Sequence, residues 1–178
     1  MSNRGVAVVA IGGNALVLDD SHRTVSDQFL AAKRAMKNVA DIVEAGWTVV
    51  LTHGNGPQVG YILRRSELAL DELHPVPMDY AGADTQGAIG YMFKKALRNE
   101  FVRRKMPHNV ITIVTQVRVS ADDSAFVTPT KPIGSYMSQD HARKMADEYG
   151  WSISEESGFG WRRVVPSPYP EDIIEFEP

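Results

Sequence analysis

Two short apolar runs near the N-terminus, each ending in a glycine loop, define the expected architecture. Residues 6–11 (VAVVAI) and 47–51 (WTVVL) are rich in β-branched residues and are short enough for buried strands. Apolar residues between these runs recur at three- and four-residue steps, which predicts a helix with one apolar face. They are Phe29, Ala32, Met36, Val39 and Val43. Strand, helix and strand form a βαβ unit, whose crossover should be right-handed.

The ends of the helices are predicted from capping residues and prolines. Ser26 is placed to cap the first helix, with Asp27 in its first turn and Gly46 at its C-terminal end. A second helix should open on Pro57, because the missing N–H of proline would be unsatisfied at that position anyway. The prolines within residues 73–77 should end that helix.

A long helix is expected over residues 78–104, and its first half is rich in small residues. These are Ala81, Gly82, Ala83, Gly87, Ala88 and Gly90. Each interior glycine costs about 1 kcal/mol relative to alanine, so close packing should offset this cost. The packing partner is either the sheet, the glycine loops or the same helix of a second subunit.

The second part of the chain differs from the first in composition and in the elements it predicts. Residues 110–115 (VITIVT) predict another buried strand, whereas residues 117–136 are polar and turn-rich and predict an excursion or hairpin. A short helix fits residues 139–149, and the segments 151–153 and 161–165 are candidates for paired strands. Ser138 and Gly150 cap that helix. The proline-rich exit from Pro166 to Pro170 is typical of a linker.

Composition narrows the class of protein. The chain has 178 residues, a net charge of −3 with acids and bases interspersed, and no cysteine. Disulfides, thiolate metal sites and cysteine nucleophiles are therefore excluded, and a general nucleic-acid binder is disfavoured. The N-terminal apolar run is short and is not typical of a signal peptide, and no run is long enough to span a membrane. A cytoplasmic protein is the default expectation.

The two glycine loops are candidate anion sites. They are Gly12-Gly13-Asn14 and Gly54-Asn55-Gly56, each directly after an expected strand. Glycines let the backbone approach a ligand closely, and free N–H groups at a helix start favour phosphate or carboxylate. Neither loop has the spacing of a known nucleotide fingerprint. The alternative is a pair of tight turns without a ligand, in which the asparagines only tolerate left-handed backbone conformations.

Lys131 is the most suggestive charged residue. It lies between Pro129 and Pro132, in a segment whose φ angles are partly fixed. A stiffly mounted ammonium suits a phosphoryl group in transfer, because its charge need not be reorganised. The alternative is an ordinary exposed lysine on a loop.

Other polar residues have weaker signals. The five histidines do not pair at metal-ligand spacing, but His53 lies at a strand end and is placed either to contact a ligand or to make a structural hydrogen bond. Arg162 and Arg163 should face opposite sides of a strand, so that one meets an anion or acid or both are solvated. Asp79 and Asp84 fit the role of acids near a helix start.

These segments together resemble carbamate kinases of the amino acid kinase family. The matching strings are AIGGNAL at 10–16, THGNGPQVG at 52–60, DYAGADTQGAIGYM at 79–92, PTKPIG at 129–134 and WRRVVPSP at 161–168. They occur in the family's order and cover nearly the whole chain. PTKPIG favours the carbamate kinase branch over acetylglutamate or uridylate kinases.

The resemblance implies an α/β fold, a three-layer αβα sandwich on a mainly parallel sheet, with a small protruding subdomain at about residues 118–162. It implies reversible phosphoryl transfer between ATP and carbamate, giving ADP and carbamoyl phosphate, with Mg²⁺ and a place in arginine metabolism. Carried over by position, Lys131 approaches the phosphate and the loops bind the acceptor and phosphate. The loop residues are Gly12, Gly13, Asn14, Gly54, Asn55 and Gly56. A homodimer through the helix at 78–104 is also implied.

One departure from the family is large. Carbamate kinases continue into a second half that binds the nucleotide, whereas residues 1–178 match only the N-terminal, acceptor-binding half. The resemblance therefore implies that this chain alone is inactive. Two alternatives stay open: a non-catalytic anion-binding or dimerisation module, and a kinase of another carboxylate acceptor.

Overall fold

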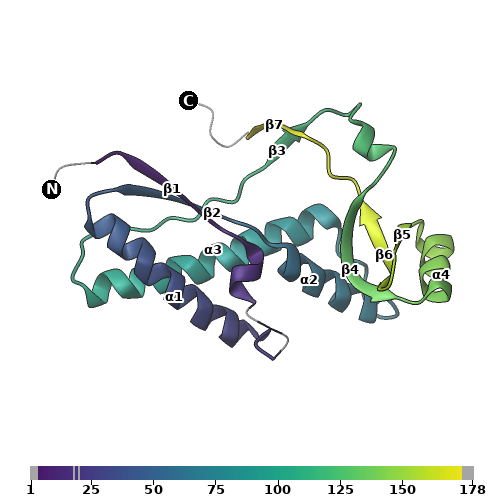
Figure 1. The fold of residues 1–178 in the computed structure, drawn as a ribbon, viewed down its shortest axis with the longest axis horizontal. Coiled ribbons are helices and arrows are strands. Elements are labelled where there is room, and N and C mark those ends of the chain that lie inside the picture. Colours follow the sequence, from purple (N-terminus) through teal and green to yellow (C-terminus); the bar gives the residue numbers. More distant parts are fainter. Residues whose placement is uncertain (1–3, 18, 20, 174–178) are drawn as a thin grey trace. The chain divides into compact units, whose positions relative to one another are not determined.

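The computed structural model describes residues 4–17, 19 and 21–173, and the chain forms two compact units (Figure 1). The first unit comprises Met1–Gln58 and Met78–Val114, and the second comprises Val59–Pro77 and Thr115–Pro178. No helix among the described residues is both long and apolar enough to cross a membrane.

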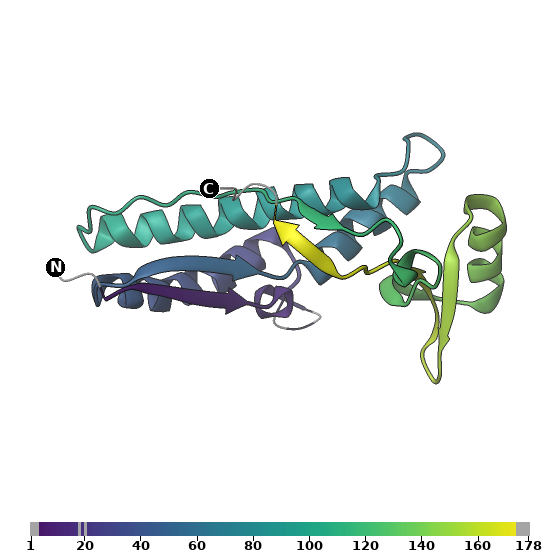
Figure 2. The same cartoon turned by 90° about the horizontal axis from the view of Figure 1, so that it is seen from above.

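The first unit is built on a parallel pair of strands, as predicted. β1 (Val6–Ile11) pairs with β2 (Thr48–His53) in register from Val6↔Thr48 to Ile11↔His53, and Figure 2 shows the two strands side by side. β2 extends two residues beyond the expected end, so Thr52 and His53 belong to the strand and not to the loop. A short 3₁₀ helix, Gly13–Leu16, follows β1. The expected βαβ unit is confirmed.

Two long helices cover one face of this pair. α1 (Val25–Glu44) packs against α3 (Met78–Arg103), which confirms both predicted helices. The predicted apolar face of α1 is buried at Ala32, Met36, Val39 and Val43, and Phe29 is half-buried. The inward side chains of the strands complete this core. They are Val9, Ile11, Val49 and Leu51.

The opposite face of the strand pair is apolar and exposed. The outward side chains Val6, Val8 and Val50 are 63%, 70% and 48% exposed. Strands that are apolar on both faces are typical of parallel sheets covered on both sides. Among the described residues of the first unit, α1 and α3 cover one face of the strand pair, and the other face is uncovered.

An ion network joins the C-terminal ends of α1 and α3. The Arg104 guanidinium contacts Asp41 at 2.6 Å, Glu44 at 2.8 Å and Glu100 at 2.7 Å. Hydrogen bonds from Arg103 and Arg104 lower the pKa of Glu100 to about 2. Shared contacts of this kind fix the register between the two helices more firmly than a single exposed pair does.

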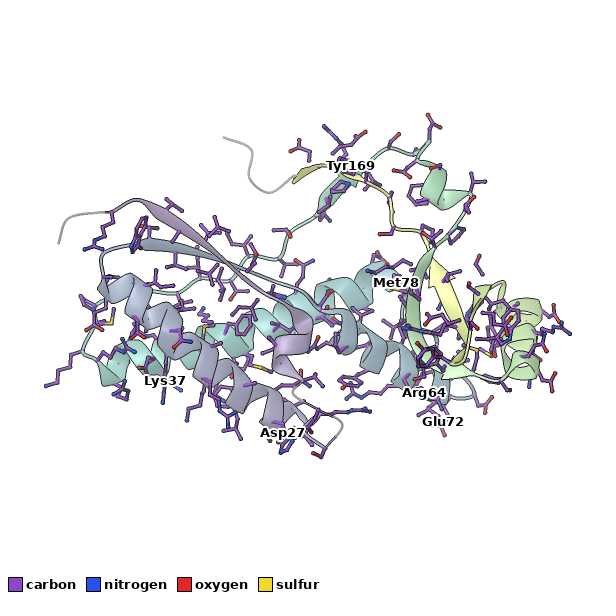
Figure 3. All side chains as sticks on the ribbon, in the orientation of Figure 1. Asp27, Lys37, Arg64, Glu72, Met78 and Tyr169 are labelled. Carbon is purple, nitrogen blue, oxygen red and sulfur yellow. The ribbon has the colours of Figure 1, made fainter. Side chains whose placement is uncertain are left out.

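Two predicted caps of α1 are wrong by one or two residues. Thr24, not Ser26, is the N-cap: its hydroxyl accepts from the Asp27 N–H at 3.1 Å, and the Asp27 carboxylate accepts from the Thr24 N–H at 3.0 Å. Figure 3 shows Asp27 at this end of the helix. At the other end the C-cap is Ala45, and Gly46 follows it with φ +96°.

The predicted strand at residues 110–115 is also wrong. Residues 107–116 form no strand, and within the first unit Thr112 lies against α3, where its hydroxyl donates to the Gly90 carbonyl at 3.1 Å. A β-branched run becomes a strand only when a neighbouring strand pairs with it. In the described part of the chain β2 pairs with β1 alone.

α2 (Gly56–Leu68) begins one residue before the predicted start at Pro57. It ends at Leu68, before the prolines within residues 73–77 that were expected to end it. Its last turns, from Val59, belong to the second unit. The Val76 N–H then donates to the Ser66 hydroxyl at 2.8 Å, so this helix also anchors the chain that follows it.

The second unit contains an antiparallel sheet in the order β4 (Lys131–Met137), β6 (Gly160–Val165) and β5 (Ser152–Glu156). The pairing of β5 with β6 confirms the predicted strand pair. α4 (Gln139–Tyr149) has the predicted caps, Ser138 and Gly150 with φ +66°.

The proline-rich exit has no regular structure over residues 166–169 and leads into a further strand, to which only Pro170 of this exit belongs. β7 (Pro170–Ile173) pairs antiparallel with β3 (Val117–Val119), and a 3₁₀ helix, Ser124–Phe126, lies between β3 and β4. Pro170 is the first residue of β7, where a strand tolerates a missing N–H. The α/β class is thus confirmed, and the described residues form small sheets of which one is parallel and two are antiparallel.

The capping geometry of α1 predicts an asymmetry between two neighbouring hydroxyls. Thr24→Ala should lower the free energy of unfolding by about 1 kcal/mol, because it removes the N-cap acceptor. Ser26→Ala, the matched control two residues away, should have a much smaller effect. Urea denaturation of both variants measures this difference, and equal effects would contradict the assignment of Thr24 as the cap.

Two glycines of α3 should respond in opposite directions to alanine. A Cβ on Gly90 would overlap with Thr112 Cγ2, whereas a Cβ on Gly87 meets nothing within 4 Å. Gly90→Ala should therefore displace Thr112 and lower the free energy of unfolding. Gly87→Ala should raise it by up to about 1 kcal/mol through helix propensity. Thermal denaturation checks this, and stabilisation by both substitutions would refute the packing argument.

Candidate functional site

The two glycine loops meet at the carboxyl ends of β1 and β2. The Gly54 N–H donates to the Ile11 carbonyl at 2.9 Å. A Cβ on Gly13 would lie 3.1 Å from the Gly54 carbonyl and the Asn55 nitrogen, and a Cβ on Gly54 would lie 3.0 Å from the Gly13 nitrogen. Both positions therefore need glycine for the backbones to approach. The structure brings together the loops that the sequence singled out.

The outer glycines of the two loops have open space. A Cβ on Gly12 or Gly56 would meet nothing within 4 Å, so packing within the described residues does not demand glycine there. Gly56 is the first residue of α2, whose opening N–H groups lack intrahelical acceptors. The Asn14 side chain lies outside the described residues.

Asn55 makes a side-chain hydrogen bond that the sequence did not indicate. Its amide nitrogen donates to the Thr85 hydroxyl on α3 at 2.8 Å. Among the described residues the only non-glycine residue with positive φ is Lys105. A left-handed backbone conformation therefore does not explain why an asparagine occupies position 55. Thr85 is the site neighbour that sequence reasoning missed, and its only signal was a hydroxyl in a stretch of small residues.

His53 makes structural contacts within the first unit. Its Nδ1 donates to the Gly54 carbonyl at 3.2 Å, and its ring stands edge-on to Phe93 with centroids 5.8 Å apart. These contacts match the structural alternative considered from the sequence. They also place an imidazole directly beside the second loop.

Lys131 is exposed and is the first residue of β4 in the second unit. In the part of the chain that the structure describes, its ammonium has no hydrogen bond and no ion pair. Its backbone pairs with Val165 of β6. A cation without a protein partner is available to an anion, and it is also what an ordinary surface lysine presents.

The two arginines of β6 occupy opposite faces of the strand and have structural partners. Arg162 donates to the Gly134 carbonyl at 3.1 Å and to Glu156 at 3.3 Å. Arg163 lies over the Trp151 ring at 4.6 Å, and burial lowers the pKa of its guanidinium. The solvated alternative is therefore wrong for both residues. Neither guanidinium needs an external anion to explain its position.

The remaining acidic candidates stay at the surface. Asp79 is in the first turn of α3, as predicted, and Asp84 is exposed one turn later. The described residues contain no cluster of three or more histidine, aspartate or glutamate side chains that could hold a metal ion.

Asp123 ties the two ends of the excursion together within the second unit. Its carboxylate accepts from the Ala125 N–H at 2.8 Å and from the Tyr169 N–H at 2.9 Å. These hydrogen bonds lower the pKa of Asp123. A shallow groove lies beside it, lined by Thr128, Thr130 and Tyr169 among others. The contact joins the segment before Lys131 to the segment after β6.

The chain matches curated proteins along almost its full length. It is 46% identical over 173 residues to a carbamate kinase from Pyrococcus horikoshii, which covers 96% of this chain and 55% of that protein. A carbamate kinase from Clostridium perfringens is 43% identical over 173 residues, again with 55% of its length covered. The chain is homologous to carbamate kinases.

Solved structures of similar proteins agree with this homology. A carbamate kinase from Giardia lamblia bound to AMP-PNP has a TM-score of 0.86 and 39% identity, over 98% of this chain and 55% of that one. A crystal structure from Aeropyrum pernix K1 has a TM-score of 0.88 and 38% identity, over 97% of this chain and 55% of that one. No family model matches the chain.

The match covers only part of each relative. It spans about half the length of the curated relatives and corresponds to their N-terminal portion. Both glycine loops and Lys131 lie within the aligned length, which leaves little of this chain unmatched.

The Asp123 contact predicts a local and pH-dependent effect in this carbamate kinase homologue. Asp123→Ala should expose the Tyr169 and Ala125 amides to faster hydrogen exchange at neutral pH, because both lose their acceptor. The neighbouring Asp122→Ala is the matched control and should leave them protected.

The sign of the pH dependence follows from the lowered pKa. The contribution of Asp123 is present above the ordinary aspartate pKa of about 3.9 and is lost as the pH falls through the lowered value. An NMR titration that finds the Asp123 carboxyl at or above its ordinary pKa would contradict this assignment.

Proposed function

We propose that this chain forms the acceptor- and phosphate-binding part of a carbamate kinase, which transfers phosphate reversibly between ATP and carbamate. The observation that carries the proposal is the backbone contact between two glycine loops at the ends of paired parallel strands, in a chain homologous to carbamate kinases. Ligands in open α/β sheets bind outside the carboxyl ends of strands.

The loops would hold the oxygens of the acceptor and of the transferring phosphate through backbone N–H groups. The proposed binding residues are Gly12, Gly13, Asn14, Gly54, Asn55 and Gly56. The open space at Gly12 and Gly56 supports this role, because a ligand could lie where no protein atom explains the glycine. The first N–H groups of α2 lack intrahelical acceptors, and they favour a negative charge at the same loop.

Lys131 is the proposed catalytic residue. In the direction of ATP use, an acceptor oxygen of carbamate attacks the terminal phosphorus as the bond from that phosphorus to the ADP oxygen breaks. The transition state carries negative charge on the phosphoryl oxygens. An ammonium beside these oxygens lowers the energy of the transition state. The unpaired ammonium of Lys131 among the described residues supports this role. No covalent intermediate on the protein is invoked.

The nucleotide and Mg²⁺ are assigned to the portion of the enzyme beyond the matched length. The described residues present no cluster for a metal ion, and we assign no residue of this chain to the nucleotide. The AMP-PNP in the Giardia lamblia carbamate kinase supports a nucleotide site in the full-length protein.

The finer architecture is proposed on the same basis. The exposed apolar face of β1 and β2 supports a three-layer αβα sandwich in which the remaining portion supplies the missing layer and further strands. We propose that residues 118–162 form the protruding subdomain that carries Lys131. We also propose a cytoplasmic homodimer through α3, where the open space at Gly82 would admit the same helix of a partner.

The test is ATP formation from ADP, Mg²⁺ and carbamoyl phosphate. The chain alone should be inactive, and activity should return when it is mixed with a polypeptide that comprises the unmatched portion of the Clostridium perfringens carbamate kinase. In that mixture Lys131→Ala should lower turnover by about 100-fold or more. Lys33→Ala, an exposed lysine of α1, is the matched control and should leave turnover unchanged.

Two outcomes would refute different parts of the proposal. A mixture that is correctly associated but inactive would contradict the assignment as an acceptor-binding part. An active mixture with unchanged turnover in Lys131→Ala would remove only the catalytic role of that lysine.

A further inference from the structure

A buried threonine on α3 controls the orientation of Asn55 in the second glycine loop. Thr85 is 2% exposed. Its Oγ1 lies 2.9 Å from the Ala81 carbonyl oxygen and 2.8 Å from the Gly82 carbonyl oxygen. The same oxygen lies 2.8 Å from Asn55 Nδ2. The hydroxyl therefore links the loop to the preceding turn of the helix.

The number of hydrogens decides the direction of this contact. A threonine hydroxyl has one hydrogen and two lone pairs. The hydrogen is donated to the helix carbonyls, which accept only, so the lone pairs of Oγ1 are left to receive a donor. The Asn55 amide nitrogen is such a donor, whereas its oxygen is not. The Asn55 amide is consequently held with Nδ2 toward α3.

This orientation leaves the Asn55 amide oxygen as an unused acceptor. Among the described residues no protein group donates to Oδ1, and Asn55 is only partly buried between the exposed Gly54 and Gly56, so this oxygen is accessible to a ligand. An acceptor in this position selects for a ligand with an N–H donor, because a ligand without one leaves the oxygen unpaired.

We propose that Asn55 Oδ1 accepts a hydrogen bond from the N–H of the acceptor substrate and that Thr85 is the positioning residue for this contact. This inference rests on the proposed function and adds the basis of discrimination within it. The site would favour a small carboxylate with an attached amino group, such as carbamate, over acetate of similar size.

The experiment compares two acyl phosphates that differ in the N–H group. Equilibrium binding of carbamoyl phosphate and acetyl phosphate to the 178-residue chain is measured for the wild type, Thr85→Val and Thr85→Ser. The wild type should prefer carbamoyl phosphate by roughly 2- to 10-fold, the range of one neutral hydrogen bond. Thr85→Val should bind the two about equally, since Asn55 is then free to turn its nitrogen outward. Thr85→Ser keeps the hydroxyl and should keep the preference.

A second readout reports the hydrogen bond without any ligand. The ¹⁵N-resolved side-chain NH₂ signals of Asn55 should shift in Thr85→Val and stay near their wild-type positions in Thr85→Ser. Unchanged Asn55 signals in Thr85→Val, or a preference that survives this substitution, overturn the inference. Equal binding of both phosphates by the wild type overturns the inference alone. No binding of either phosphate by the folded wild type overturns the proposed function as well.

Discussion

The contact between Gly13 and Gly54 is the constraint on which the first unit depends. Two loops can share this space only because neither residue carries a Cβ, and the in-register pairing of β1 with β2 brings the loops to the same height. A one-residue slip in that pairing would separate the loops and would also turn the core side chains outward. The geometry of the candidate site and the packing of the core are therefore set by the same register.

α1 and α3 connect this contact to the rest of the first unit. α1 and α3 pack together beneath the strands, and the Arg104 ion network holds their ends at one relative position. Thr85 then connects α3 to the second loop. The loop is thus held from two directions, by its strand and by a helix that is far away in sequence. This arrangement gives a site of small backbone groups a defined shape before any ligand arrives.

Local signals predicted most elements, and the errors arose where the outcome depended on distant partners. β1, β2 and α4 follow from apolar periodicity and caps. The start of α1 was misplaced because Ser26 was chosen as the capping hydroxyl, whereas the structure uses Thr24 together with Asp27. The run at 110–115 has strand propensity, yet propensity does not supply a neighbouring strand. The role of Thr85 needed the fold, because only the fold brings it to Asn55.

The uncovered face of β1 and β2 has a consequence for how the stability of this chain should be measured. Any molecule that covers Val6, Val8 and Val50 in the folded state and does not bind the unfolded state raises the melting temperature by mass action. The midpoint then depends on the concentration of that molecule, and on the concentration of the chain itself when the cover is a second copy. A single melting temperature is consequently a property of the solution as much as of this polypeptide.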